Sequence, residues 1–266
     1  MILRKTFVQP LLSHRLRTLG LLVFLSVSVV VPTGSARAAT LWYSGDFDLN
    51  DATTNQNNVP IQLGTSYVLE RALVYNNFIV PVGQTWSITS VFSNNQLAYV
   101  VPPTSAAWEI RTGLTAGQGG NLIASGDTAA TATLLTPADG INYIAPEYRI
   151  EATVAGLTLT AGAYWLAVAP DSTGYYFGDQ SFIETTSGVN AVGLPSGSNG
   201  NSFLDNNLPG GGKLTFAASN LNYSMGVVGT AAVPEPASAI LLVAALAGVP
   251  ALLRRHRCRS MRGQTA

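Results

Sequence analysis

Cysteine and histidine are almost absent from this chain of 266 residues, and neither occurs in its long central part. The only cysteine is Cys258 and the two histidines are His14 and His256, all outside residues 40–232. The central part therefore cannot form a disulfide, a Ser-His-Asp triad, a Cys-His pair or a zinc site built from His or Cys. Most hydrolase mechanisms are excluded, and the fold must be stabilised by its core alone.

Basic residues are also scarce in the central part. It holds four of them against thirteen acidic residues, a balance of −9, although the whole chain has a formal net charge of zero. The remaining basic residues gather at the two ends of the chain, so nucleic acid is not expected as a partner. No phosphate-binding Gly-rich motif ending in Lys-Ser or Lys-Thr is present either.

The first residues have the order of a secretory signal peptide. Four basic residues come before an apolar run over residues 19–31, which is followed by Pro32 and the small-residue motif Ala36-Arg37-Ala38. This order predicts a signal peptide over residues 1–39, cleaved after Ala38 or Ala39. An uncleaved anchor is the alternative, but the apolar run is short for a membrane span.

The last part of the chain has a Val-Pro-Glu-Pro motif at 233–236, an uncharged run over residues 237–253 and a basic tail over residues 254–262. As a helix, residues 237–253 would be roughly 25 Å long, the short end of what crosses a bilayer. Basic flanks stay on the cytoplasmic side, so Arg254, Arg255 and Arg257 predict a cytoplasmic C-terminus. A buried core helix is the alternative, but such a helix rarely lacks polar residues on every face.

Together, the two ends resemble the signals of the bacterial PEP-CTERM proteins. The resemblance lies in a signal peptide combined with the motif Val233-Pro234-Glu235-Pro236, the apolar segment and the basic cluster, over residues 233–259. In that family the C-terminal segment is a sorting signal read by exosortase, a membrane-embedded transpeptidase, and members are associated with extracellular polysaccharide. The resemblance implies export, transient anchoring in the inner membrane and cleavage near residues 234–236, followed by release or transfer to the cell surface.

The central part has the sequence pattern of β-strands. Residues 147–154 alternate charged or Thr residues with apolar ones, the period of a strand with one buried face. Similar alternation occurs at 86–92, 157–160 and 164–168, with weaker candidates at 72–80, 107–111, 122–124, 213–217 and 223–228. Turn-forming residues separate these runs, among them Pro81-Val82-Gly83 and the loop 193–201. We therefore expect one all-β domain over residues 40–232, a β-sandwich or jelly roll with no helix.

Four segments of this domain also resemble a β-rich domain that recurs among PEP-CTERM proteins. They are residues 41–48, 108–113, 187–193 and 223–227. Their motifs are structural in character, and the resemblance implies no established activity.

One Asx-rich stretch is a candidate cation site. Asp46, Asp48 and Asn50 place oxygen ligands at alternate positions, as a calcium loop does. The EF-hand pattern fails, because it needs Gly where Asp51 stands and Glu where Asn57 stands. A looser calcium loop completed by a remote acid is therefore one interpretation, and an ordinary Asx-rich turn is the alternative. Calcium is the only cofactor candidate.

Three groups of residues bear on sugar chemistry. Glu147 and Glu151 share a strand face about 13 Å apart, too far for a glycosidase pair, so a solvated face is the better interpretation. Tyr175 and Tyr176 follow a turn, where aromatic rings can stack on sugars, although a hydrophobic plug is the commoner explanation. The tryptophans in strand-like runs are expected in the core or on a sheet face, namely Trp86, Trp108 and Trp165.

The sequence therefore predicts an exported, non-enzymatic protein of the cell surface or extracellular matrix, associated with exopolysaccharide and processed by exosortase. Before processing, the C-terminal helix would hold it in the membrane. A carbohydrate-binding module is the first alternative and would show a row of exposed aromatic residues on one face. A carboxylate-dependent glycosidase is the weaker alternative and would show two acids facing each other across a cleft.

Overall fold

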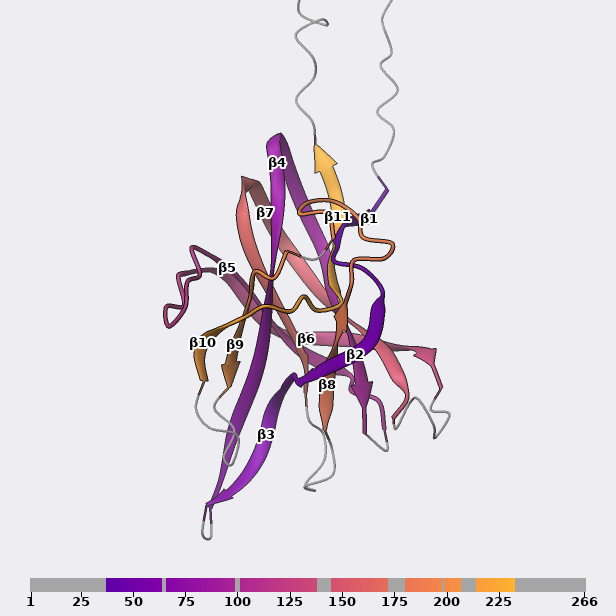
Figure 1. Ribbon diagram of the computed structural model, residues 1–266, viewed down its shortest axis with the longest axis vertical. Coiled ribbons are helices and arrows are strands. Elements are labelled where there is room, and N and C mark those ends of the chain that lie inside the picture. Colours follow the sequence, from indigo (N-terminus) through magenta and orange to yellow (C-terminus); the bar gives the residue numbers. More distant parts are fainter. Residues whose placement is uncertain are drawn as a thin grey trace, which may run out of the picture. The chain divides into compact units, whose positions relative to one another are not determined.

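The computed structural model describes residues 37–63, 66–98, 101–137, 145–171, 180–197, 199–206 and 214–232, which all belong to one compact unit, Ala36–Ala266. These described residues form eleven β-strands and no helix, and all the strand pairs are antiparallel in one sheet (Figure 1). The all-β prediction is confirmed.

The strands are β1 (Ala39–Tyr43), β2 (Phe47–Thr54), β3 (Gln56–Leu63), β4 (Ser66–Leu97), β5 (Ser105–Thr112), β6 (Asn121–Thr136), β7 (Glu147–Pro170), β8 (Ser181–Thr186), β9 (Ser202–Asn206), β10 (Leu214–Ser219) and β11 (Met225–Ala232). The main path through the sheet is β1-β11-β4-β7-β5-β6. Strands β3, β8 and β9 pair with other parts of β4, while β2 pairs with β8 and β10 pairs with β9.

The two long strands β4 and β7 give the sheet its shape. They pair from Asn76 opposite Leu166 to Gln96 opposite Glu147, with a register shift between Val80 and Thr85. At this shift β4 folds back on itself (Figure 1), and Gly83 takes a φ of 79°, a conformation that glycine adopts without strain. Residues 81–83, predicted to be a turn between two strands, are therefore a bend inside one continuous strand.

This bend brings both halves of β4 to the same hydrophobic core. Phe78, before the bend, stacks on Trp86, after it, with ring centroids 6.1 Å apart. The same ring also stacks on Trp42 of β1 and Tyr164 of β7, at 5.4 and 5.5 Å. The halves of the sheet thus face each other across one core, an arrangement consistent with a β-sandwich.

A second, smaller cluster covers the outer face of the sheet beside β9. It consists of Leu73, Tyr75, Leu114, Trp165, Ala167, Ala169 and Phe203, with Phe216 of β10 packed against it. Successive strand residues point to opposite faces, so Trp165 and Leu166 of β7 belong to different clusters. Both faces of the central strands are therefore buried. The expected burial of Trp86, Trp108 and Trp165 is confirmed.

The first and last strands lie next to each other. β1 pairs with β11 from Ala39 opposite Gly229 to Tyr43 opposite Gly226. Because the pair is antiparallel, the beginning of β1 and the end of β11 lie at the same end of the sheet (Figure 1). Within the described ranges, no helix meets the length and apolarity required to span a membrane. The predicted helix at 237–253 lies outside those ranges.

Candidate functional site

A small cleft opens along one edge of β4, where that edge has no paired strand for a few residues in the described part of the chain, while the other edge pairs with β7. Asn76 pairs with Ser202 of β9, and Ile79 forms a bridge to Leu194, so the chain between 194 and 202 leaves this edge and returns to it. The cleft has about 150 Å³ of space, part of it open to solvent. It is lined by Trp42, Ser44, Asn76, Asn77, Pro195, Gly197, Asn199 and Asn222.

Several polar atoms of these lining residues are buried and have no hydrogen-bond partner among the described residues. They are Trp42 Nε1, Asn76 Oδ1, Asn77 Oδ1, and both Nδ2 and Oδ1 of Asn222. Asn222 is 3% exposed, yet neither end of its amide is satisfied. Leaving such a group unsatisfied costs about 1–3 kcal/mol, so partners from outside the chain are expected here.

The chemistry of the cleft favours a neutral, hydroxyl-rich or amide-bearing partner. None of the eight described residues that line it is ionisable, and the unpartnered atoms include both donors and acceptors. The 150 Å³ includes open solvent, and the space within the cleft has no room for a water molecule. A partner would therefore contact the cleft only from its open side.

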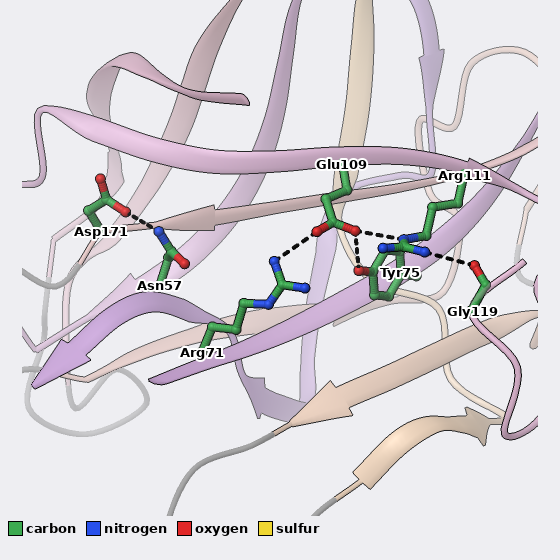
Figure 2. A network of polar contacts seen from close by, with 7 residues as sticks. All are labelled: Asn57, Arg71, Tyr75, Glu109, Arg111, Gly119 and Asp171. Carbon is green, nitrogen blue, oxygen red and sulfur yellow. Dashed lines mark hydrogen bonds and ion pairs between the residues drawn. The ribbon is translucent and has the colours of Figure 1, made fainter. Parts of the chain in front are cut away.

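A charged network lies on the outer face of the sheet (Figure 2). Glu109 of β5 is its centre: Arg71 Nη1 donates to Glu109 Oε1 at 2.8 Å, while the Tyr75 hydroxyl and Arg111 Nε donate to Oε2 at 2.7 and 2.6 Å. Glu109 is paired with Ala167 of β7. The small side chain at Ala167 leaves room above β7, so that residues of β4 reach across to β5.

This network holds its carboxylate ionised. Burial alone would raise the pKa of Glu109, but the hydrogen bonds from Tyr75 and Arg111 and the charge of Arg71 lower it below its ordinary value of 4.5. Burial and the neighbouring carboxylate raise the pKa of the Tyr75 hydroxyl well above 10.0. Each group is thus fixed in one protonation state near neutral pH, so the network cross-links strands and is unsuited to proton transfer.

Figure 2 also shows a separate contact, in which Asn57 Nδ2 donates a hydrogen bond to Asp171 Oδ1 at 2.7 Å.

Two other carboxyl groups are buried without such partners. Glu147 and Glu184 are 0% and 1% exposed, and within the described ranges the Oε1 atom of each has no hydrogen-bond partner. Burial, together with the charge of Glu184, raises the pKa of Glu147 to about 8. Burial, together with the charges of Asp48 and Asp51, raises the pKa of Glu184 to about 7.

The interpretation of Glu147 as part of a solvated face is therefore wrong. Glu151, four residues further along β7, does match that interpretation: it is half-buried, binds Arg149 at 3.0 Å and accepts a hydrogen bond from Ser90. The difference arises because Glu147 stands at the end of β7, opposite Gln96, where β4 also pairs with β8. The alternation of charged residues along one strand does not reveal this cover.

The candidate calcium residues lie at the start of β2. Asp46 accepts hydrogen bonds from the Tyr43 hydroxyl and from Asn190, and Asp48 accepts one from Thr185. Asp48 and Asn50 lie within β2, in the irregular stretch between Phe47 and Ala52, which are paired with Thr186 and Glu184 of β8. In the part of the chain that the structure describes, no group of three or more His, Cys, Asp or Glu residues is placed to hold a metal ion. Calcium binding by Asp46, Asp48 and Asn50 stays a prediction.

The other predicted site residues lie outside the described ranges. They are Tyr175 and Tyr176, the sorting motif Val233–Pro236, and the basic residues Arg254, Arg255 and Arg257. Conversely, the sequence did not identify Asn76, Asn77 and Asn222, which the fold brings to one cleft. One signal was present: Asn76-Asn77 interrupts the apolar run at 72–80, where amides are unexpected on either face.

No protein-family model matches this sequence, and comparison with curated proteins finds no match.

Proposed function

We propose that this chain is an exported, non-enzymatic protein of the cell surface or extracellular matrix, delivered by the two signals at its ends. The observation that supports this most is how the first and last described strands lie relative to the expected cleavage sites. β1 begins at Ala39, next to the expected signal-peptide cleavage site, and β11 ends at Ala232, directly before Val233. Cleavage at both predicted positions would leave nearly all of β1 and the whole of β11 in place.

The neighbouring placement of β1 and β11 also suits anchoring. Ala39 and Ala232 belong to adjacent strands and lie at the same end of the sheet. An apolar segment after Val233 would therefore hold the domain by this end. In this proposal a jelly-roll or sandwich domain is displayed on a C-terminal membrane helix and then released or transferred by exosortase.

Intact-mass measurement of the exported protein tests this proposal. We expect an N-terminus near Ala39 and no residues after about Pro236. Cells that lack exosortase are the control and should retain the C-terminal segment. Mature protein that still carries residues 254–262 in exosortase-positive cells would contradict the sorting role.

A carbohydrate-binding function is the second candidate, and the cleft beside β4 is the observation that favours it. Its unpartnered indole and amide groups match the donors and acceptors of sugar hydroxyls. The row of exposed aromatic residues that was expected for such a module has no counterpart among the large exposed apolar residues of the described part, which are all aliphatic. The polar cleft, rather than an aromatic surface, carries this candidate.

A glycan array on the exported protein, with wild type and Asn222→Ala, separates a binding role from a structural one. In the described part of the chain the Asn222 side chain makes no hydrogen bond, so its removal should not lower the melting temperature. If the cleft binds sugars, the variant should lose array signal while Asn121→Ala, at the exposed start of β6, keeps it. Array signal that is unchanged in Asn222→Ala would exclude this cleft as the binding site.

A further inference from the structure

The bend of β4 lies at one end of the sheet, and β11 finishes at the same end. Ala232 lies opposite Thr85, which in turn lies opposite Thr160 of β7. β11 is antiparallel to this half of β4, so it runs toward the bend and its chain leaves the domain in the direction in which the bend projects (Figure 1). Residues 81–84, 160–163 and 231–232 are called the bend end below.

The bend end presents one large apolar side chain to its surroundings. Val82 is 96% exposed, the highest fraction among the exposed large apolar residues of the described part. Polar groups beside it have internal partners: Trp86 Nε1 donates to Gln84 Oε1 at 2.9 Å, and the Tyr164 hydroxyl donates to Thr160 O at 2.9 Å. These bonds hold the bend end in place and leave Val82 as its apolar contact point.

The strands that meet at the bend end are uncharged there. Residues 76–90 of β4, 152–168 of β7 and 225–232 of β11 include no charged residue, although the central part of the chain holds thirteen acidic ones. From Thr85 away from the bend, the first charged residue in the ladder with β7 is Glu151, opposite Phe92 and about 23 Å along the strand. An anionic lipid surface repels carboxylates, and a charge placed in a bilayer is costly, so this end is the one suited to a membrane.

The sequence after β11 sets how far this end can lie from a membrane. Only the four residues Val233–Pro236 separate Ala232 from the apolar segment 237–253. Fully extended, four residues span at most about 14 Å. A chain anchored by that segment therefore keeps the bend end beside the bilayer, where a protein partner would have to fit into the same narrow gap.

We propose that the bend end rests on the outward-facing leaflet of the membrane, with Val82 at the headgroup boundary, while the C-terminal segment anchors the chain. This inference rests on the proposed function, because the contact depends on the anchor. Even one myristoyl chain binds membranes only marginally, so a single valine makes contact only because the short tether holds it there. Cleavage near residues 234–236 removes the tether, and the contact is lost with it.

Quenching by spin-labelled lipids tests this contact in the full-length chain, reconstituted in vesicles that contain anionic lipid. Cys258→Ser provides a background without thiols, since Cys258 is the only cysteine. An environment-sensitive fluorophore is attached at Val82→Cys or, as the matched control, at Ala98→Cys. Ala98 is exposed and lies just past the far end of β4, about 43 Å along the strand from Thr85. We expect several-fold stronger quenching at Val82→Cys than at Ala98→Cys.

A second label position tests the role of the valine itself. Ala161→Cys is exposed at the same end, so its label reports the contact when Val82 is replaced. Val82→Asp should lower the quenching of this label several-fold, because it places a carboxylate against anionic lipid. The same substitution should leave the melting temperature unchanged, since the Val82 side chain is almost fully exposed.

Vesicle flotation separates this inference from the proposed anchoring. A chain that does not float with the vesicles would contradict the anchor, and the contact would fall with it. A chain that floats while the labels at Val82→Cys and Ala98→Cys are quenched alike would overturn the contact alone. Shielding of the Val82→Cys label that grows with the protein-to-lipid ratio, without quenching by lipid, would assign the bend end to a protein partner and also overturn the proposal.

Discussion

The buried acids Glu147 and Glu184 predict that the domain loses stability as the pH rises from 5 to 7. In the unfolded chain both groups have a pKa near 4.5, whereas in the folded chain the values are about 8 and about 7. Below pH 4.5 both states are protonated and the groups have no effect. Above it, the unfolded chain releases protons that the folded chain retains, so the free energy of unfolding falls until the folded pKa is passed.

The expected size follows from these shifts. Each group lowers the free energy of unfolding by about 1.4 kcal/mol per pH unit while only the unfolded form is ionised. Between pH 5 and pH 7 the two groups together remove roughly 4 kcal/mol. For a domain of this size, 1 kcal/mol corresponds to about 2–4 °C, so the melting temperature should fall by roughly 10 °C. Glu109 does not oppose this change, because its lowered pKa gives a stabilisation that is lost only at more acidic pH.

Thermal unfolding of residues 37–232 at pH 5, 6, 7 and 8 is the assay. Replacing both acids, Glu147→Gln with Glu184→Gln, should flatten the profile, because the amides do not titrate. Glu151→Gln is the matched control, since it changes a half-buried carboxylate on the same strand and should leave the slope unchanged. A wild-type melting temperature that is level or rises from pH 5 to pH 7 would refute the reasoning.

Three further predictions follow from the core, the charged network and the Asx-rich strand. Phe78→Ala should lower the free energy of unfolding by about 3–5 kcal/mol in urea titrations, because the ring stacks on three others; a loss under about 1 kcal/mol would be inconsistent with that packing. Glu109→Ala should cost about 3–5 kcal/mol in the same assay, since it leaves Arg111 and the Tyr75 hydroxyl without their acceptor, and a neutral result would show that the network is dispensable. If Asp46, Asp48 and Asn50 bind calcium with a dissociation constant in the 10⁻⁴–10⁻³ M range, a free calcium concentration tenfold above that constant adds about 1.4 kcal/mol to the free energy of unfolding. The melting temperature should then be highest in calcium and lower in magnesium and in chelator. For Asp48→Ala it should be equal in all three.

The sequence predicted strands where one face packs on the core. Residues 147–154 alternate because Ile150, Ala152 and Val154 point into the main cluster, and this local signal gave both the element and its buried face. The tryptophans were placed correctly for the same reason. Binary patterning reports burial directly, so it succeeds wherever burial alternates along the strand.

Features that depend on distant segments were not predictable in this way. Residues 48–51 form an irregular stretch of β2 between the paired positions Phe47 and Ala52, and their partner strand β8 lies more than a hundred residues away in the sequence, so no local pattern defines their conformation. The pattern of β7 alone predicts a solvent-exposed Glu147, because it does not reveal that β4 and β8 cover this side chain. The cleft likewise needs Asn222 and the segment after Leu194 to meet Asn76, and no local pattern encodes that meeting.

The adjacency of β1 and β11 determines how the domain would respond to mechanical force. β11 lies between two neighbours and shares eight residue pairs with β4 and four with β1. Tension applied at Ala232 against the rest of the domain runs along the strand and loads these ladders in shear, so many hydrogen bonds must break together. Tension applied between Ala39 and Ala232 instead peels β1 from β11 one pair at a time, starting at Ala39 and Gly229. A domain held by its C-terminal end would therefore withstand drag that opens it readily when both of its ends are pulled.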